Sequence, residues 1–337
     1  MKNRTPPHDN SSVSSDNKDI VELVRPESSK NLQSSEQSKE RRLSLNSGDS
    51  TEHKSVLLED VMNLLAPQKG ESYLDLTAGY GGHTLSVISE TKAPSKATLV
   101  DRDVFAFEYL EKVPELKGAN LVHNSFKNAC DSLIKANTTY DMILLDLGVS
   151  SPQLDNADRG FSFKQEAKLD MRMDQGQELT AEQVINTYSR SALENILKTY
   201  GEVKNVRKVV DIIIDKRPYV ATTDFAESLK SVNLRKPSQL LSQVFQAIRI
   251  EVNQELVELQ EALVLLPQLL NRGGRLAVIS FHSLEDRAVK NTFKLWTSDG
   301  LLNEFEVLTK SAIQGKIHDV TNPRSRSAML RAVAKIK

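Results

Sequence analysis

The stretch LDLTAGYGGHTLSV, residues 74–87, decides the fold of this chain. Its first residues are apolar and predict a buried strand, Gly79, Gly81 and Gly82 predict a turn, and the residues after them are typical of a helix. Glycine lets the backbone approach a ligand closely, and the first turn of a helix offers unpaired N–H groups. In an open parallel sheet, ligands bind beyond the carboxyl ends of the strands. We therefore expect an α/β fold with a ligand site at this turn.

The rest of the chain repeats this alternation of short apolar runs and helical stretches, which predicts a mostly parallel sheet with crossover helices. The predicted parallel strands are residues 72–77, 97–103, 119–125, 140–151 and 274–283. Helical stretches separate the first four. Two further candidate strands lack a long helix between them and predict an antiparallel pair at the sheet edge, residues 304–309 and 327–336.

Changes of pattern divide the chain into four segments. Residues 1–50 are rich in Ser, Asn, Gln and mixed charge with few large apolar residues, so we expect a disordered tail. Residues 51–154 and 241–337 supply the two parts of the α/β core, and the long connection 155–240 predicts an inserted helical domain. We expect the chain to return through one long helix over 243–266, because a single apolar stripe runs along it.

Composition excludes several classes of protein. No run of about 18 apolar residues occurs in the sequence, so no membrane span is expected. Cys130 is the only cysteine, which excludes an intramolecular disulfide and favours a reducing, cytoplasmic location. None of the six histidines has a second His or a Cys at ligand spacing, so no metal site is expected. With a net charge of −1, any affinity for nucleic acid must come from local basic patches.

Two ligands compete for the glycine turn: a dinucleotide and S-adenosylmethionine. The dinucleotide pattern G-x-G-x-x-G requires a third glycine, and GYGGHT has His83 and Thr84 after the adjacent glycines. Asp101 lies about 20 residues further on, where a ribose-binding carboxylate is expected for either ligand. Asp101 and Asp103 flank Arg102 and argue against a bound 2′-phosphate. These residues favour S-adenosylmethionine, and a glycine turn without a ligand is the plain alternative.

The end of the fourth predicted strand carries a second group of candidate residues. Asp146 ends the strand, and a turn of small residues follows with Ser150, Ser151 and Pro152. A methyl transfer needs acidic and carbonyl groups near the donor's sulfonium, and it needs the acceptor held in line. Hydroxyl and carbonyl oxygens accept hydrogen bonds from an exocyclic amine, so we expect this turn to hold the acceptor. A strand-to-loop turn capped by serines is the plain alternative.

If the methyl acceptor is a nucleobase, the position of Cys130 bears on which atom of the base is methylated. Methyl transfer to carbon 5 of a pyrimidine needs a thiolate that adds to the ring. Cys130 lies in the helical stretch 126–136, where we expect it to pack in the core. An exocyclic amine attacks the methyl group directly, so amine methylation is favoured.

His282 follows the fifth predicted strand and faces the same edge of the sheet. It either lines the substrate cleft or caps the next helix, whose first turn carries Glu285 and Asp286. The sequence leaves both interpretations open.

Longer stretches resemble a known family. They are HKSVLLEDV (53–61), LDLTAGYGGHT (74–84), DRD (101–103), ILLDLGVSSPQLDNADRGFSF (143–163), LDMRMD (169–174), FQAIRIEVNQEL (245–256), GGRLAVISFHSLEDR (273–287) and NPRSRSAMLR (322–331). In this order they resemble the bacterial small-subunit (16S) ribosomal RNA cytosine-N4 methyltransferases, the MraW family, over nearly all of residues 53–337.

The resemblance implies a class I S-adenosylmethionine-dependent methyltransferase, with a Rossmann-like sheet and an inserted small helical domain. The implied reaction is N4-methylation of a cytidine in the decoding region of small-subunit rRNA, within an assembled or nearly assembled 30S subunit. A homodimer is compatible with it. The cofactor-binding residues, with Gly79 added from the same turn, would be Gly79, Gly81, Gly82, His83, Asp101, Phe126, Asp146 and Gln153. The acceptor would be held by Asp146, Ser150, Ser151 and Pro152.

Basic stretches are the candidates for RNA contact, although each alone is more often a solvated face. They are residues 203–210, 215–219, 233–239 and 322–331, the last with Arg324, Arg326 and Arg331. Two departures from the family pattern, Val203 and Gln243, lie near the return of the insert and bear on RNA docking.

Other functions stay open at this point. The same fold and cofactor would serve methylation of DNA, of another RNA base or of a protein amine. A non-catalytic assembly factor is a further alternative, although the intact candidate site argues against it. A nicotinamide dehydrogenase is disfavoured because the glycine spacing is wrong.

Overall fold

The computed structural model describes residues 54–230, 237–298 and 303–337. The predicted tail 1–50 and the basic residues Arg235 and Lys236 lie outside these ranges. Residues His53–Lys337 form one compact unit. None of the described helices combines the length and the apolar character that a membrane crossing requires.

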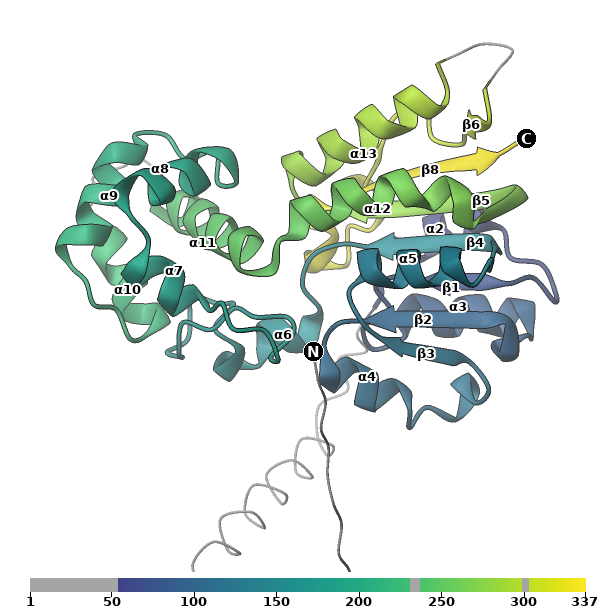
Figure 1. Cartoon of the computed structure of the whole chain (residues 1–337), viewed down its shortest axis with the longest axis horizontal. Coiled ribbons are helices and arrows are strands. Elements are labelled where there is room, and N and C mark those ends of the chain that lie inside the picture. The colour runs from purple at the N-terminus through teal and green to yellow at the C-terminus, as the bar shows by residue number, and fades with distance from the viewer. Residues whose placement is uncertain (1–53, 231–236, 299–302) are drawn as a thin grey trace, which may run out of the picture. The chain divides into compact units, whose positions relative to one another are not determined.

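Within the described residues, eight strands form one sheet in the order β3-β2-β1-β4-β5-β8-β6, with β7 paired to β8 (Figure 1). The strands are β1 (Tyr73–Asp75), β2 (Ala97–Asp101), β3 (Asn120–His123), β4 (Tyr140–Asp146), β5 (Leu270–Ser280), β6 (Phe305–Val307), β7 (Ile313–Gln314) and β8 (Met329–Lys335). Strands β1 to β5 pair in parallel, and β8 pairs antiparallel with β5, β6 and β7. The predicted α/β sheet with its antiparallel edge is confirmed. The strand order reverses at β1, which lies between β2 and β4, so the ends of these strands open a crevice.

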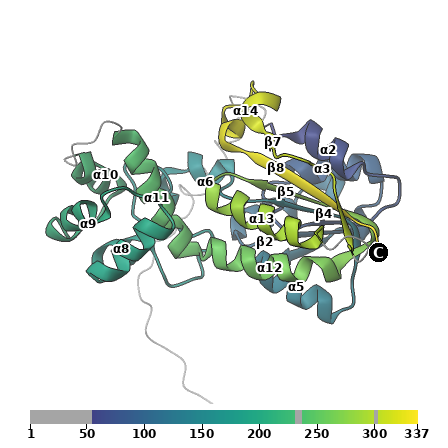
Figure 2. The ribbon, with the colours of Figure 1, turned by 90° about the horizontal axis from the view of Figure 1, so that it is seen from above.

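Helices cover both faces of the sheet (Figure 2). One face carries α5 (Phe126–Lys135), α12 (Glu255–Leu269) and α13 (Ser283–Trp296), and the other carries α2 (Leu58–Leu65), α3 (Gly82–Thr91) and α4 (Val104–Leu110). Alternate residues of β4 supply the two cores, because Ile143 and Leu145 face the first layer and Met142 and Leu144 face the second. A strand buried on both faces is apolar throughout, which explains the continuous apolar run in β4.

A separate hydrophobic core joins the helices between β4 and β5 (Figure 1). These helices are α7 (Ala181–Thr187), α8 (Arg190–Thr199), α9 (Val206–Asp215), α10 (Thr222–Lys230) and α11 (Pro237–Asn253). Val203, one of the departures from the family pattern, is buried in this core. The core extends along α11 to Val252. This core supports the proposal of an inserted helical domain. Its extent suggests that the proposed domain ends near Gln254 and not at residue 240.

The prediction of one long returning helix is wrong. Gln254 adopts the left-handed conformation, with φ of 52°, and separates α11 from α12. Val252 packs in the core of the insert, whereas Leu259 packs against the sheet. Asn253, the residue before the break, accepts a hydrogen bond from the backbone N–H of Met173 at 2.8 Å. Apolar periodicity missed the break because the apolar spacing continues across it.

Candidate methyl-transfer site

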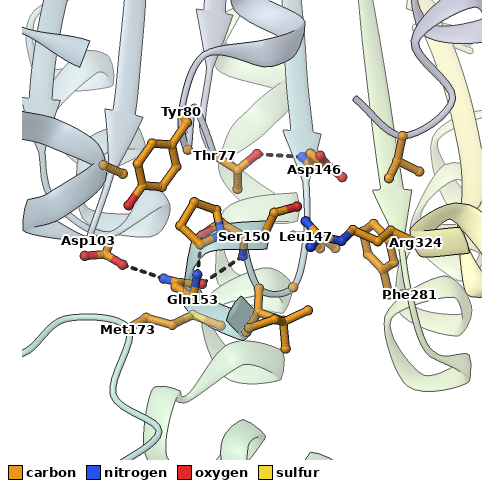
Figure 3. Close-up of a pocket in the computed structure, with 18 of the residues that line it drawn as sticks. Thr77, Tyr80, Asp103, Asp146, Leu147, Ser150, Gln153, Met173, Phe281 and Arg324 are labelled. Carbon is orange, nitrogen blue, oxygen red and sulfur yellow. Dashed lines mark hydrogen bonds between the residues drawn. The ribbon is translucent and has the colours of Figure 1, made fainter. Parts of the chain in front are cut away.

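A cavity of about 910 Å³ lies beyond the carboxyl ends of β1, β2 and β4 (Figure 3). It brings together almost all of the predicted site residues: Gly79, Gly82, His83, Asp101, Phe126, Asp146, Ser150, Ser151, Pro152 and Gln153. Gly81 does not line it. The cavity lies within the size range of small-molecule sites, near its upper end.

Asp101 ends β2 with both carboxylate oxygens occupied. Its Oδ2 accepts a hydrogen bond from the N–H of Gly79 at 2.7 Å, and its Oδ1 accepts one from the N–H of Asp103 at 2.8 Å. Gly79 has φ of +52°, a conformation that side chains rarely adopt, so glycine suits this position. Burial raises the pKa of Asp101 to about 6. A carboxylate oxygen has further lone pairs, so Asp101 can hold the turn and still accept hydrogen bonds from a ribose diol.

Gly81 shares the left-handed conformation of Gly79, with φ of +81°, and both Gly81 and Gly82 are also limited by neighbouring side chains. A Cβ on Gly82 would lie 2.2 Å from Oγ of Ser55, and a Cβ on Gly81 would lie 3.2 Å from a methyl carbon of Leu110. Both glycines therefore make room for side chains of the protein. The expectation that they also clear space for the ligand stays a prediction.

Asp146 ends β4 in a different state. Its backbone N–H donates to Oγ1 of Thr77 at 2.6 Å, and its Oδ2 lies 3.6 Å from Nδ1 of His83. The other nitrogen of His83 is hydrogen-bonded to the carbonyl of Val56 at 2.9 Å. Oδ1 of Asp146 is enclosed and has no hydrogen-bond partner in the protein. Burial raises the pKa of this carboxyl to about 6, against an opposing effect of His83. A small rotation of the carboxylate would let an amine or cation in the cavity supply the missing partner.

The turn after β4 is the cap of a short helix, α6 (Ser151–Asp155). Oγ of Ser150 accepts from the N–H of Gln153 at 3.4 Å, and the N–H of Ser150 donates to Oε1 of Gln153 at 2.8 Å. Nε2 of Gln153 donates to Oδ2 of Asp103 at 2.7 Å, and Nη1 of Arg159 donates to the same oxygen at 2.7 Å. The turn capped by Ser150, which was predicted, therefore also forms a wall of the cavity. Asp103 orients this turn through its hydrogen bond with Gln153.

Aromatic rings flank the cavity. Phe126 begins α5, packs in the core and also lines the cavity. The guanidinium of Arg102 lies 5.6 Å above its ring. Tyr80 also points into the cavity (Figure 3) and lies 5.1 Å from the ring of Tyr109. Sequence reasoning missed Tyr80, and its signal was a large aromatic residue between two glycines.

His282 combines both predicted roles. It is the N-cap of α13, where Nδ1 accepts from the N–H of Glu285 at 3.4 Å, and it lines the cavity. Ligand atoms of Glu255, His282 and Glu285 lie within 4.8 Å of one another, a grouping that the sequence analysis missed because its members come from two helices. Arg249 holds Glu255 through two hydrogen bonds of 2.8 Å, so a guanidinium already supplies positive charge there.

Cys130 lies on the buried side of α5 and packs in the core against the sheet. Burial raises the pKa of its thiol to about 12. The predicted packing role is confirmed, and a thiolate at this position is strongly disfavoured.

The C-terminal arginines differ in what they contact. Arg331, on β8, is held by Asp286 through hydrogen bonds of 2.7 and 3.1 Å, so it is occupied within the protein. Arg326 is exposed. Arg324 lines the cavity and pairs with Asp155. Of the three predicted RNA contacts, only Arg324 therefore reaches the site.

These residues fit S-adenosylmethionine. Asp101 can bind the ribose hydroxyls, Phe126 and Tyr80 provide apolar faces for the adenine, and Asp146 faces the cavity with a carboxylate that lacks a partner. The arrangement suits a cationic donor and an acceptor amine.

Comparison with known proteins gives a consistent result. The family model of the MraW methylase family matches residues 50–336. A protein of Mycoplasmopsis synoviae named ribosomal RNA small subunit methyltransferase H is 40% identical over 297 residues, which cover 85% of this chain and 98% of that protein. A protein of the same name from Nostoc punctiforme is 42% identical, over 84% of this chain and 94% of that protein. A solved rRNA methylase of Streptococcus thermophilus aligns with a TM-score of 0.38 and 12% identity, over 85% of this chain and 99% of that chain, a likeness too weak to carry an argument. The match to a methylase family confirms the predicted class I fold and the predicted cofactor, S-adenosylmethionine.

Proposed function

Because this chain belongs to the MraW methylase family, we propose that it transfers the methyl group of S-adenosylmethionine to N4 of a cytidine in small-subunit rRNA. The relatives named as small-subunit rRNA methyltransferases support the RNA, and the chemistry of the cavity supports the amine. The decoding region and an assembled or nearly assembled 30S subunit are part of this proposal.

The observation that carries the choice of an amine is the state of Asp146. Its buried Oδ1 lacks a donor, and the capped turn at Ser150 lies directly after it in the chain. A neutral exocyclic amine brings the N–H group that this oxygen lacks. Carbon 5 of a pyrimidine has no such group, and its methylation would need a thiolate that Cys130 does not supply.

The bound cofactor supplies an electrophilic methyl group on a sulfonium, and this chain's residues position the acceptor. Asp101 and the glycine turn fix the ribose end, while Asp146 accepts one hydrogen of the amine and orients its lone pair toward the methyl carbon. The amine gains positive charge as it attacks, and the carboxylate of Asp146 stabilises that charge. Transfer would leave S-adenosylhomocysteine and a methylated ammonium, which would lose one proton to solvent to give the neutral N4-methyl product. With a pKa of about 6, Asp146 is ionised at neutral pH and available for this role.

The target base must leave its stack to reach the cavity, so the surrounding RNA needs its own contacts. Exposed basic residues on and beside α9 of the insert, Lys204, Arg207 and Lys208, are suited to bind phosphates. We propose that contacts between RNA phosphates and these basic residues hold the ribosomal subunit against the insert, and that the cavity selects the base.

Transfer of a labelled methyl group tests this function. The protein is incubated with small subunits from cells that lack the activity and with methyl-labelled S-adenosylmethionine, and the rRNA is digested and separated into nucleosides. Label in N4-methylcytidine is the expected result. Label in another nucleoside, in ribosomal protein or only in DNA would overturn the proposed acceptor. Binding of cofactor without any transfer would favour the non-catalytic assembly factor.

A further inference from the structure

We propose that Arg324 is a specificity-determining residue that donates a hydrogen bond to the acceptor edge of the target cytosine, formed by N3 and O2. The inference rests on the proposed function and deepens it, because it states how the site distinguishes cytosine from uracil.

Arg324 is held firmly at the cavity wall. It lies in the short 3₁₀ helix Pro323–Ser327, which immediately precedes β8. Its backbone N–H donates to Oδ1 of Asn322 at 3.2 Å, and Nδ2 of Asn322 donates to the carbonyl of Lys54 at 3.0 Å. The side chain reaches into the cavity toward Leu147, from the side opposite Tyr80 (Figure 3).

The guanidinium of Arg324 is only partly satisfied. Nη2 donates to both carboxylate oxygens of Asp155, at 2.9 and 2.8 Å. Asp155 ends α6, the helix whose N-cap is Ser150, so this contact fixes the guanidinium relative to the capped turn. Nη1 is enclosed and has no hydrogen-bond partner in the protein. A small rotation of the guanidinium, when the base enters, would present this nitrogen to the ligand.

Two residues of the same cavity therefore lack hydrogen-bond partners of opposite kinds. Oδ1 of Asp146 lacks a donor, and Nη1 of Arg324 lacks an acceptor. The edge of cytosine carries an amine donor beside two acceptors, N3 and O2, which complements this pair. Uracil presents a carbonyl where cytosine has the amine and an N–H where cytosine has N3. It would place an acceptor against Asp146 and, where Arg324 contacts N3, a donor against Arg324, and unpaired groups of this kind are strongly rejected. O2 is an acceptor in both bases, so discrimination by Arg324 comes from N3.

The charge around Arg324 favours a base over a phosphate. Asp155 already balances the guanidinium, and Asp146 adds a second carboxylate to the same cavity. A phosphate would meet these carboxylates, whereas a neutral carbonyl or ring nitrogen needs only a directed N–H group. The geometry thus points to base recognition.

A cross-comparison of enzyme variants and substrate atoms tests this contact. Small subunits are reconstituted with rRNA that carries cytidine, 3-deazacytidine or 2-thiocytidine at the position that the wild-type protein methylates. The wild-type kcat/KM is expected to fall about tenfold with at least one analogue, the size of a directed contact to a base edge. Arg324→Lys is expected to be about tenfold slower on cytidine and to lose less than about threefold further on that analogue, because the contact is already gone.

Two variants serve as controls. Arg272→Lys, exposed near the start of β5 and outside the cavity, is expected to behave as wild type on all three substrates. Asp155→Asn removes the ion pair but keeps the guanidinium, and it is expected to retain the analogue penalty. The affinity of each variant for S-adenosylmethionine reports whether the site is intact, and Arg324→Gln carries the same comparison if the lysine variant binds no cofactor.

The outcomes separate this inference from the proposed function. Equal analogue penalties in wild type and Arg324→Lys, or no penalty in wild type, would overturn the base contact. Weaker RNA binding of Arg324→Gln, with a smaller salt dependence and an unchanged analogue penalty, would assign Arg324 to a phosphate instead. Failure of the wild-type protein to methylate N4 of unmodified cytidine would overturn the function itself.

Discussion

The ends of β2 and β4 carry the same residue type in opposite states. Asp101 ends β2 with both oxygens bound to backbone N–H groups, whereas Asp146 ends β4 with one oxygen that has no partner. Burial raises the pKa of both carboxyls to about 6, so burial alone does not distinguish them. The difference indicates two roles. The carboxylate of Asp101 is hydrogen-bonded within the protein and holds the glycine turn, whereas we propose that the carboxylate of Asp146 obtains its missing hydrogen bond from a ligand.

The largest effect is expected when the charge at the end of β4 is removed. Asp146→Asn keeps the shape of the side chain and removes its charge, so methyl transfer to the rRNA should fall about 10³-fold, as for loss of one preorganised electrostatic contact. Single-turnover rates with saturating cofactor measure the effect. Ser86→Ala, on the exposed face of α3, is the control and should keep the wild-type rate. A rate within threefold of wild type for Asp146→Asn would contradict the role given to the open oxygen.

Removing the charge at β2 should affect binding first. Asp101→Asn leaves one oxygen for the turn and weakens the hold on the ribose, so the Kd for S-adenosylmethionine should rise about 30-fold, in the range of losing one charged hydrogen bond. Titration calorimetry measures the Kd. Asp141→Asn is the matched control, because Asp141 lies on β4 and accepts hydrogen bonds from Ser72 instead. If both variants bind the cofactor equally well, Asp101 is not a cofactor residue.

The raised pKa values predict a pH dependence that involves both ends. In the proposed site each carboxyl binds the cofactor in its ionised form, and a group with a pKa of about 6 is mostly protonated at pH 5. The affinity for S-adenosylmethionine should therefore rise about tenfold or more between pH 5 and pH 7 and then level off. The same titration with Asp146→Asn should show a shallower rise. An affinity that is flat over this range in wild type would show that neither carboxyl titrates there.

Stability provides the smallest expected effect, with the opposite sign to activity. The folded pKa of Asp146 lies above its unfolded value of about 3.9, so ionisation destabilises the fold above pH 6 and costs nothing below about pH 4. Asp146→Asn should raise the free energy of unfolding by about 1 kcal/mol at pH 8, and the gain should vanish near pH 4. Urea unfolding at the two pH values measures it. A loss of stability at pH 8 would mean that the carboxylate is satisfied in the free protein.

Local sequence patterns predicted much of the fold and the positions of the candidate site. Strands and the glycine turn follow from apolar runs and glycines that act over a few residues, as at residues 74–87. The break at Gln254 was not predictable in this way, because a left-handed residue leaves the apolar spacing unchanged. The reason for glycine at position 82 was also hidden, since it lies in the contact with Ser55.

Long-range pairs were beyond the reach of sequence patterns. Arg324 and Asp155 are 169 residues apart, and nothing local to either one predicts their contact. Asp103 was weighed only as an argument against a phosphate, and the structure makes it the anchor of Gln153. In each case the chemistry of the residue was visible in the sequence, and its partner was supplied by the fold.

The crystal structure of the complex with S-adenosylhomocysteine, the product that remains after transfer, tests the contrast between the two strand ends most directly. The account predicts ribose hydroxyls hydrogen-bonded to Asp101 at the end of β2, and a sulfur that faces the side of the cavity occupied by Asp146 at the end of β4. A ligand whose sulfur lies away from Asp146, or whose ribose makes no contact with Asp101, would contradict the assignment of the two ends.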